Sequence, residues 1–203
     1  MPPPLILAST SRYRRELLQR LRLPFDAIAP DVDETPNAGE APAALAQRLA
    51  LAKALAVAQH HPQAVVIGSD QVADLAGEAI GKPGTHERAV AQLRRMRGRS
   101  VVFQTAVAVV RDGGRNVVGN VLAPVTVRFR ELSDTEIEHY LRTEQPYDCA
   151  GSAKAETLGI ALLDAIESDD PTALIGLPLI RTCALLRAAG LDPLAAPAAS
   201  GTP

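Results

Sequence analysis

Hydroxyl and basic side chains follow one another in residues 9–15, where the letters read Ser-Thr-Ser-Arg-Tyr-Arg-Arg. This segment comes directly after a short apolar run at residues 5–8, which is typical of a buried strand. If a helix begins after it, unpaired backbone N–H groups at its start favour an anion, and the arginines can grip phosphate oxygens. We therefore predict a phosphate-binding loop, although not a Walker A loop, because the Gly-x-x-x-x-Gly-Lys pattern is missing. The alternative is an N-capped helix with a solvated arginine face.

Carboxylates gather in residues 31–34, and Asp70 follows the apolar, β-branched run at residues 64–68. Carboxylate oxygens bind hard cations such as Mg²⁺, which neutralise phosphate charge in nucleotide enzymes. Ligand-binding groups in α/β proteins gather at the carboxyl ends of strands, where we expect Asp70 to lie. Asp70 is then a candidate metal ligand or proton acceptor for an attacking water. The alternatives are an acidic surface loop at 31–34 and a simple turn cap at Asp70.

Lysine is rare in this chain, which otherwise uses arginine, and occurs only as Lys53, Lys82 and Lys154. Lys82 lies between Gly81 and Pro83, in a turn that would restrict the direction of its side chain. A lysine ammonium group is a compact point charge that suits a phosphate oxygen. The alternative is that all three are solvated surface residues.

Other catalytic and metal chemistries are disfavoured by residue spacing. Cys149 and Cys183 form no CxxC pair, so we expect two free, at least partly buried thiols. The four histidines have no metal-ligand spacing with the cysteines, so we interpret them as structural or surface residues. Ser69 lacks the Gly-x-Ser-x-Gly elbow of the serine hydrolases.

The elements that must position these residues follow from hydrophobic periodicity. Strands are predicted at 5–8, 25–29, 64–68, 101–110, 117–130 and 156–167, with a hairpin at 73–80. Helices are predicted at 11–22, 42–60, 85–97, 133–142 and 178–189, with Thr85 as an N-cap and a capping box at 133–136. Early alternation of strands and helices, followed by a long hairpin turning at 112–114, indicates an α/β fold with a mixed sheet.

Length and composition limit the classes of protein. The 203 residues fit one domain, predicted at 1–191, with an Ala- and Pro-rich tail at 192–203. A net charge of −2 and 3% aromatic residues argue against nucleic-acid binding. The alternative is a nucleic-acid-binding module that uses the arginine-rich segment 12–22. No apolar stretch reaches the ~20 residues of a membrane span, so no membrane partner is expected. No signal-peptide pattern is present and cysteines are few, which favours the cytoplasm.

Six short segments, in this order, resemble the Maf-like family of nucleotide pyrophosphatases. They are residues 5–11, 14–18, 32–34, 68–70, 81–83, and 170–172 with 176–178. The resemblance implies a fold similar to that of the inosine-triphosphate pyrophosphatases, with a mixed, twisted sheet flanked by helices and a central cleft between two lobes. It also implies hydrolysis of a nucleoside triphosphate between its α and β phosphates, giving the monophosphate and pyrophosphate.

The resemblance carries roles onto individual residues. It implies that the phosphates are contacted by Ser9, Ser11, Arg14, Lys53 and Lys82. Glu34 matches a metal-site acid, and Asp70 matches the proton acceptor, which would also bind the metal. The implied cofactor is Mg²⁺ or Mn²⁺, the implied partner is a small-molecule nucleotide, and the family often forms homodimers.

Further residues resemble the subgroup of the family that acts on 7-methyl-GTP. They are Tyr13, Gln71, Lys154 and Glu156, which by resemblance would tune the choice of base. A methylated guanine carries positive charge, so the ring of Tyr13 can stack on it with a cation–π component, and the Glu156 carboxylate can pair with its N–H edge. The chain departs from the family's usual pattern in having Arg12 in place of proline, and Tyr13 in place of the subgroup's tryptophan.

Two alternative functions stay open at this point. The first is a pyrophosphatase for the unmodified nucleotides dTTP or UTP. The second is a nucleotide-binding regulator of cell division without turnover, against which the presence of Glu34, Asp70 and Lys82 argues.

Overall fold

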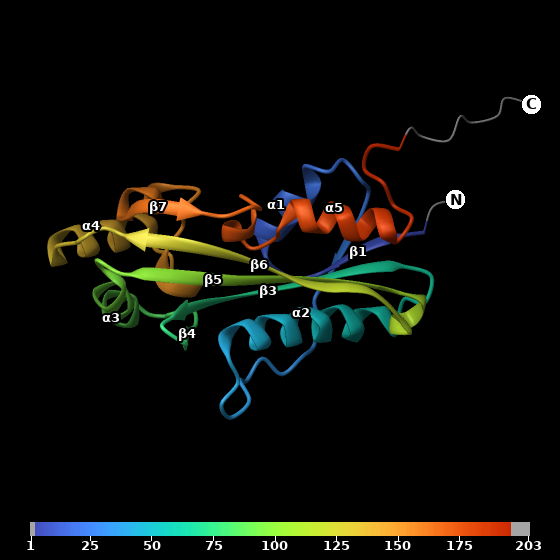
Figure 1. The fold of residues 1–203 in the computed structure, drawn as a ribbon, viewed down its shortest axis with the longest axis horizontal. Coiled ribbons are helices and arrows are strands. Elements are labelled where there is room, and N and C mark those ends of the chain that lie inside the picture. Colours follow the sequence, from blue (N-terminus) through green and yellow to red (C-terminus); the bar gives the residue numbers. More distant parts are fainter. Residues whose placement is uncertain (1–2, 196–203) are drawn as a thin grey trace, which may run out of the picture.

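The computed structural model describes residues 3–195 and contains a seven-stranded mixed sheet flanked by helices (Figure 1). The strands are β1 (Leu5–Ala8), β2 (Asp26–Ile28), β3 (Val65–Leu75), β4 (Glu78–Ile80), β5 (Ser100–Arg111), β6 (Asn116–Phe129) and β7 (Leu163–Glu167). Their order is β2-β1-β3-β5-β6-β7, and β4 pairs with β3. β1 is parallel to β2 and β3, and every other pairing is antiparallel. The predicted α/β fold with a mixed sheet is confirmed.

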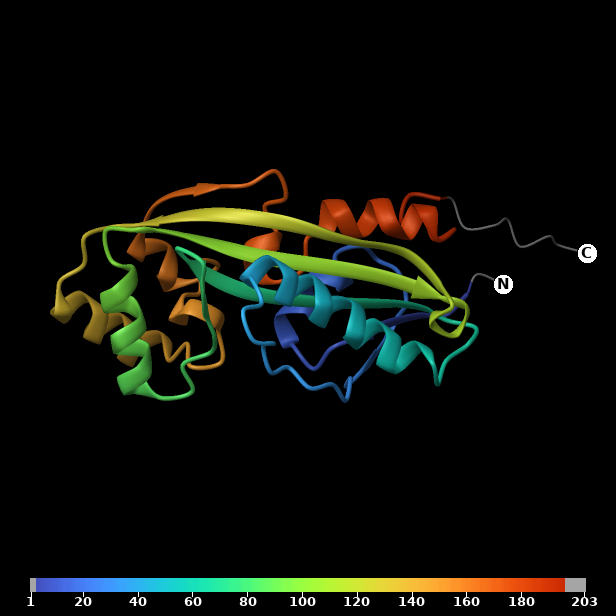
Figure 2. The same ribbon diagram turned by 60° about the horizontal axis from the view of Figure 1, so that its bottom comes forward.

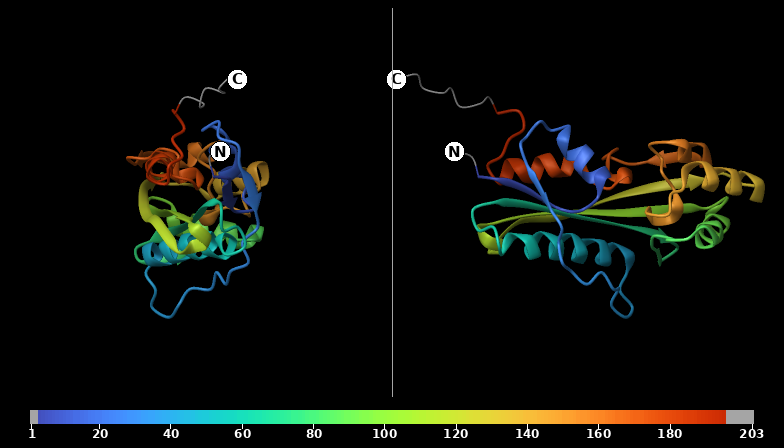
Figure 3. Two further views of the ribbon diagram at one scale, coloured as in Figure 1. Left: turned by 90° about the vertical axis from the view of Figure 1, so that its right-hand side faces the viewer. Right: turned by 180° about the vertical axis from the view of Figure 1, so that it is seen from behind.

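Helices cover both faces of the sheet at one end of the molecule. They are α1 (Arg12–Gln19) and α5 (Leu179–Ala188) on one face and α2 (Pro42–Ala58) on the other (Figures 1 and 3). Strand β1 is buried on both sides, because its side chains alternate between two hydrophobic clusters. Leu5 and Leu7 pack with α1 and α5, whereas Ile6 and Ala8 pack with α2.

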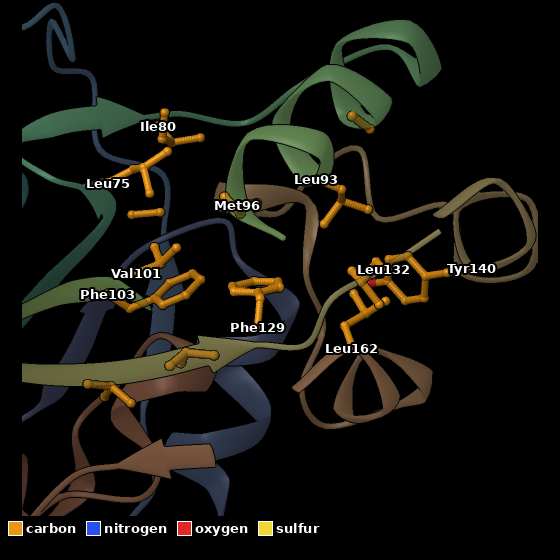
Figure 4. Packing of buried hydrophobic residues seen from close by; sticks show 14 of the residues in the cluster. Leu75, Ile80, Leu93, Met96, Val101, Phe103, Phe129, Leu132, Tyr140 and Leu162 are labelled. Atoms are coloured by element: carbon orange, nitrogen blue, oxygen red, sulfur yellow. The ribbon is translucent and has the colours of Figure 1, made fainter. Parts of the chain in front are cut away.

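A second lobe lies at the far end of the long strands β3, β5 and β6 (Figure 2). It contains α3 (His86–Met96) and α4 (Asp134–Glu144). Its core joins both helices to the ends of the strands, with Leu93, Met96, Phe103 and Phe129 among the buried side chains (Figure 4). Because the same strands run through both lobes, the lobes share one sheet.

The predicted helix caps of this lobe are present. The side chain of Thr85 accepts the N–H of Arg88 at the start of α3. At the start of α4, Ser133 and Glu136 form the reciprocal capping box. These caps satisfy backbone donors that the first helical turn leaves unpaired.

The predicted bounds of two strands, 64–68 and 156–167, were wrong. β3 does not stop at residue 68 but continues to Leu75, because β5 pairs with it from Val66 to Asp74, so Asp70 lies inside the strand rather than past its end. Of the strand predicted at 156–167, only β7 forms; the chain before it makes 3-10 turns over Leu158–Leu162. There Gly159 packs so closely on Lys154 that a Cβ would lie 2.4 Å from its carbonyl oxygen.

The helix predicted at 11–22 is also shorter, because α1 ends at Gln19 and Arg22 has a positive φ of 58°. No helix among residues 3–195 is long and apolar enough to cross a membrane. Of the predicted tail at 192–203, residues 196–203 lie outside the described part of the chain.

Candidate active site

A cavity of about 1010 Å³ lies at the junction of the two lobes. Every residue to which the family resemblance assigns a role lines it, whereas Arg15, Asp31 and Asp33 do not. The residues with an assigned role come from six segments: the β1–α1 loop with the start of α1, the loop after β2, helix α2, strand β3, the loop after β4 and the loop after α4. Segments far apart along the chain therefore meet around one space.

An ammonium group between two carboxylates lies in this cavity. The Nζ atom of Lys53, on α2, is 2.6 Å from Oδ1 of Asp70 on β3 and 2.6 Å from Oε1 of Glu34 in the loop after β2. Lys53 is 6% exposed and Asp70 7%, so both charges are largely removed from water. Buried charges are costly unless they are paired, and here each has a partner.

The charges around Glu34 change its proton affinity. Partial burial acts to raise the pKa of Glu34, but the hydrogen bond and charge of Lys53, with smaller effects of Lys82 and Arg14, outweigh it. The pKa of this carboxyl therefore lies below its ordinary value, and Glu34 stays ionised at neutral pH.

The donor set fits a divalent cation that is shared with a substrate. Among residues 3–195 no group of three or more His, Cys, Asp or Glu side chains is arranged to hold a metal ion. Mg²⁺ is usually bound by one or two carboxylates together with substrate phosphates and water, and the carboxylates of Glu34 and Asp70, both in contact with Lys53, are the donors of that kind at this point of the cavity. Asp33, in the same acidic segment as Glu34, instead accepts the N–H of Thr35 at 2.9 Å.

The predicted phosphate loop is built around the N-terminus of α1. Ser11 is the N-cap of this helix and accepts the N–H of Arg14 at 3.4 Å, while Ser9 accepts the N–H of Ser11 at 3.1 Å. The N-capped helix that we considered as an alternative is thus present, and its hydroxyls also line the cavity. Helix capping and anion binding are compatible, since a helix N-terminus has several orphan N–H groups.

The orientation of Arg14 depends on a distant loop that sequence reasoning did not include in the site. Its Nε atom donates to the carbonyl oxygen of Gly176 at 2.8 Å, and the Ser69 hydroxyl lies 2.9 Å from the same oxygen. The loop is held in turn by Asp170, which is 0% exposed and accepts the N–H of Arg181 at 3.0 Å. The available signal was the Asp-Pro-Thr and Gly-Leu-Pro segments at 170–172 and 176–178, which contribute to the family resemblance but to which we assigned no role in the site.

Burial also affects Arg14 itself. Loss of solvent lowers the pKa of Arg14, and the nearby carboxylates Asp70 and Glu34 act in the opposite direction. An arginine keeps its charge through such changes. A half-buried cation therefore lies in the same cavity as the two acids and interacts with their charges.

The cavity wall also carries the residues expected to choose a base. Tyr13 and Cys149 lie together, with Sγ 3.9 Å from the phenol oxygen. Lys154 is 7% exposed, and its Nζ lies 3.3 Å from the carbonyl oxygen and 3.5 Å from the carboxylate of Glu144. Glu156 is exposed at the cavity wall. Burial raises the pKa of Cys149 to about 12, so this thiol stays protonated and is no nucleophile.

Gln71 has a different position from the other specificity candidates. Its Nε2 donates to the carbonyl oxygens of Ala173 and Leu174, at 2.9 and 3.0 Å, and to the hydroxyl of Thr105 at 2.9 Å. The amide donors of Gln71 are therefore used in the cavity wall. They tie strand β3 to the loop that also holds Arg14.

The comparison with known proteins agrees with this geometry. A family model described as Maf-like protein matches residues 4–189. The chain belongs to the Maf-like family. It is 70% identical to a 7-methyl-GTP pyrophosphatase of Polaromonas sp. over 93% of this chain and 85% of that protein. It is 66% identical to a protein of the same name from Albidiferax ferrireducens (95% and 96% covered) and 63% to one from Bordetella pertussis (96% and 96%).

In this Maf-like protein, the loop that carries Glu34 is held by Arg48 on α2. The Nε and Nη2 atoms of Arg48 donate to the two carboxylate oxygens of Glu40 at 2.6 and 2.8 Å, and Nη2 also donates to the carbonyl oxygen of Thr35 at 3.0 Å. Bidentate pairs of this kind restrict geometry as well as adding energy. Hydrogen bonds from Arg48, and then from the N–H of Asn37, hold the pKa of Glu40 at about 2.

We expect Arg48→Gln to reduce kcat/KM by about tenfold, because misplacing a site residue by a fraction of an ångström is costly. Because folding lowers the pKa of Glu40, its ionised carboxylate stabilises the folded state at pH values above the ordinary pKa of 4.5. This contribution is lost as the pH falls towards about 2. Melting temperatures between pH 3 and 6 should therefore depend more on pH in the wild type than in the variant. Arg20→Gln, on an exposed residue outside the cavity, is the control. Equal pH dependence in the wild type and Arg48→Gln would refute the proposed role of Arg48 in holding the loop.

Gly68 allows α2 to lie close enough to β3 for Lys53 to reach Asp70. A Cβ at this position would lie 2.1 Å from the carbonyl oxygen of Ala50 and 2.7 Å from the backbone nitrogen of Ala54. We expect Gly68→Ala to lower the free energy of unfolding by about 1–3 kcal/mol, as overpacking usually does. Urea denaturation measures this, with Gly81→Ala as the control, since a Cβ there meets nothing within 4 Å. Equal stabilities of the two variants would contradict this packing argument.

Proposed function

We propose that this Maf-like protein hydrolyses a nucleoside triphosphate between its α and β phosphates, releasing a nucleoside monophosphate and pyrophosphate, with 7-methyl-GTP as the substrate. The observation that carries the proposal is the contact of Lys53 with both Glu34 and Asp70, in the cavity that also contains the α1 N-terminus. The names of the relatives support the same reaction and substrate.

The phosphates are proposed to bind along the cations of the cavity. Ser9, Ser11 and the N-terminus of α1 would receive phosphate oxygens, with Arg14 and Lys82 supplying positive charge. Lys53 would hold the carboxylates of Asp70 and Glu34 in place and add its charge to the same region. These groups would stabilise the charge that develops on the departing pyrophosphate.

The proton acceptor in this proposal is Asp70. One of its carboxylate oxygens would take a proton from a water as the water oxygen attacks the α phosphorus, and the bond to the bridging oxygen of pyrophosphate would break. A divalent cation held by Glu34 and Asp70 would supply positive charge to the phosphate oxygens. We therefore propose Mg²⁺ or Mn²⁺ dependence, which the two-carboxylate donor set supports.

The base is proposed to bind against Tyr13, Lys154 and Glu156 in the cavity wall. The ring of Tyr13 offers a stacking surface, and Glu156 offers a carboxylate for N–H groups of a guanine edge. Gln71 would act by holding the wall, because its amide donors are already used by backbone oxygens.

The decisive assay offers 7-methyl-GTP, GTP, dTTP and UTP to the purified chain with Mg²⁺ or Mn²⁺. We expect the monophosphate and pyrophosphate, with the largest kcat/KM for 7-methyl-GTP, and loss of turnover when EDTA is added. Release of orthophosphate and a diphosphate would refute cleavage at the α–β bond. Tight binding without turnover of any of the four would instead support a nucleotide-binding regulator.

We also propose that residues 1–191 form a single catalytic domain. We propose that its partner is the nucleotide rather than a nucleic acid or a membrane, and that the protein acts in the cytoplasm as a monomer or homodimer. Cys149 and Cys183 are free thiols, which fits a reducing compartment. Light scattering of the purified protein measures the oligomeric state.

A further inference from the structure

The side chain of Arg12 lies on the ring that is proposed to stack on the base. Its guanidinium carbon is 4.7 Å from the centroid of the Tyr13 ring, and its Nη2 atom donates to the phenol oxygen at 2.7 Å. Both side chains line the cavity. An arginine cation therefore already covers one face of the tyrosine.

This arrangement changes what the ring offers to a ligand. A stacked base must use the opposite ring face or displace the guanidinium. In either case it meets a positive charge that interacts with the same π system, whose negative potential attracts cations. A base that itself carries positive charge is repelled by Arg12, whereas a neutral base of the same shape is not.

The carboxylates of Asp148 and Glu16 lie near Arg12, but within residues 3–195 neither forms an ion pair with its guanidinium, so they offset its charge only in part. Lys154, the other cation at this end of the cavity, is paired with Glu144. Among residues 3–195, the polar contact of the Arg12 guanidinium is the phenol of Tyr13, which is uncharged at neutral pH. Arg12 is also exposed, so salt in the solvent can screen its charge.

We propose that Arg12 is a specificity-determining residue that lowers the preference of this enzyme for a positively charged purine base over neutral guanine. The proposal rests on the proposed function, since it concerns the base site of the same cavity. Arg12 acts on discrimination between two nucleotides whose triphosphates are identical. A substitution of Arg12 should therefore change the two nucleotides unequally, and an equal change for both would not support this role.

The test compares kcat/KM for 7-methyl-GTP and GTP in the wild type, Arg12→Gln and Arg12→Glu. Arg20→Gln, an exposed arginine at the end of α1 outside the cavity, is the matched control. We expect the ratio of 7-methyl-GTP to GTP to rise about threefold to tenfold in Arg12→Gln, for charges about 7 Å apart near the surface, and further in Arg12→Glu. The control should keep the wild-type ratio, and added salt should reduce the differences.

An unchanged ratio in both Arg12 variants would overturn the proposal, as would an equal loss for the two nucleotides, which would mark Arg12 as a phosphate contact. The proposed function is refuted by a different result, namely that the wild type hydrolyses neither nucleotide. In that event the same variants are compared by the dissociation constants of the two nucleotides in calorimetry. The same rise in the binding ratio supports the role of Arg12, and its absence, or absence of binding, refutes it.

Discussion

Asp70→Asn should reduce kcat by about 10²–10⁴-fold, the range that a positioned general base contributes, while the fold stays intact. The amide has nearly the same shape as the carboxylate, but it cannot take a proton from water and carries no charge for a cation. The residue lies within the ladder between β3 and β5, so its backbone position does not depend on the side chain. Steady-state rates of pyrophosphate release, with circular dichroism for the fold, measure both parts of the expectation.

A second aspartate on the same strand provides the control. Asp74 accepts the N–H of Gly77 at 2.7 Å and the amide of Gln104 at 3.2 Å, outside the cavity. Asp74→Asn should keep kcat within about threefold of the wild type, because it leaves the proposed proton acceptor unchanged. Near-normal turnover by Asp70→Asn would exclude Asp70 as the proton acceptor.

Lys53→Met should lower kcat/KM by about 10²–10³-fold, the cost typical of losing one preorganised charge in an active site. Methionine fills a similar volume, but it leaves the carboxylates of Glu34 and Asp70 facing each other without the ammonium between them. Breaking a fully buried ion pair costs about 3–5 kcal/mol. We expect a loss of this order, because Asp70 is 7% exposed and is left buried without its partner, whereas the pair with Glu34, whose side chain is 57% exposed, adds little.

The same variant should change how stability depends on pH. In the wild type, folding lowers the pKa of Glu34, so its ionised carboxylate stabilises the folded state at pH values above the ordinary pKa of 4.5. This contribution is lost as the pH falls below 4.5. Without Lys53 the main cause of the lowering is gone and burial acts to raise the pKa. The difference in melting temperature between wild type and variant should therefore be larger at pH 7 than at pH 4.

The control is Gln59→Met, at the exposed C-cap residue of the same helix, where the new methionine leaves Lys53 paired with both carboxylates. It should keep both the activity and the pH dependence of the wild type. A constant difference in melting temperature between Lys53→Met and the wild type from pH 4 to pH 7 would contradict the coupling of Lys53 to Glu34.

The structure connects these two residues to the rest of the site through the backbone. Gly68, two positions before Asp70, sets how closely α2 approaches β3, and the carbonyl of Gly176 directs Arg14 from another loop. Substitutions away from the cavity can thus move the reacting groups. Measurements on Gly68→Ala should accordingly show a loss of activity together with the loss of stability.

Local patterns in the sequence were enough for much of the fold and for the membership of the site. Apolar runs and helical spacing identified the strands and helices, because a period of two or 3.6 residues reflects which side faces the core. The capping box at Ser133 was also readable, since all of its atoms come from four consecutive residues. Every residue to which the family resemblance assigned a role lines the same cavity.

The contacts between these residues were decided only by the tertiary structure. Ser69 and Asp70 look like the end of a strand, but pairing with β5 carries the strand past them. Arg14 finds its partner at Gly176, 162 residues away, and the ammonium of Lys53 sits between two acids. Such contacts depend on how separate elements pack, and the order of residues within one element contains no information about the neighbour it will meet.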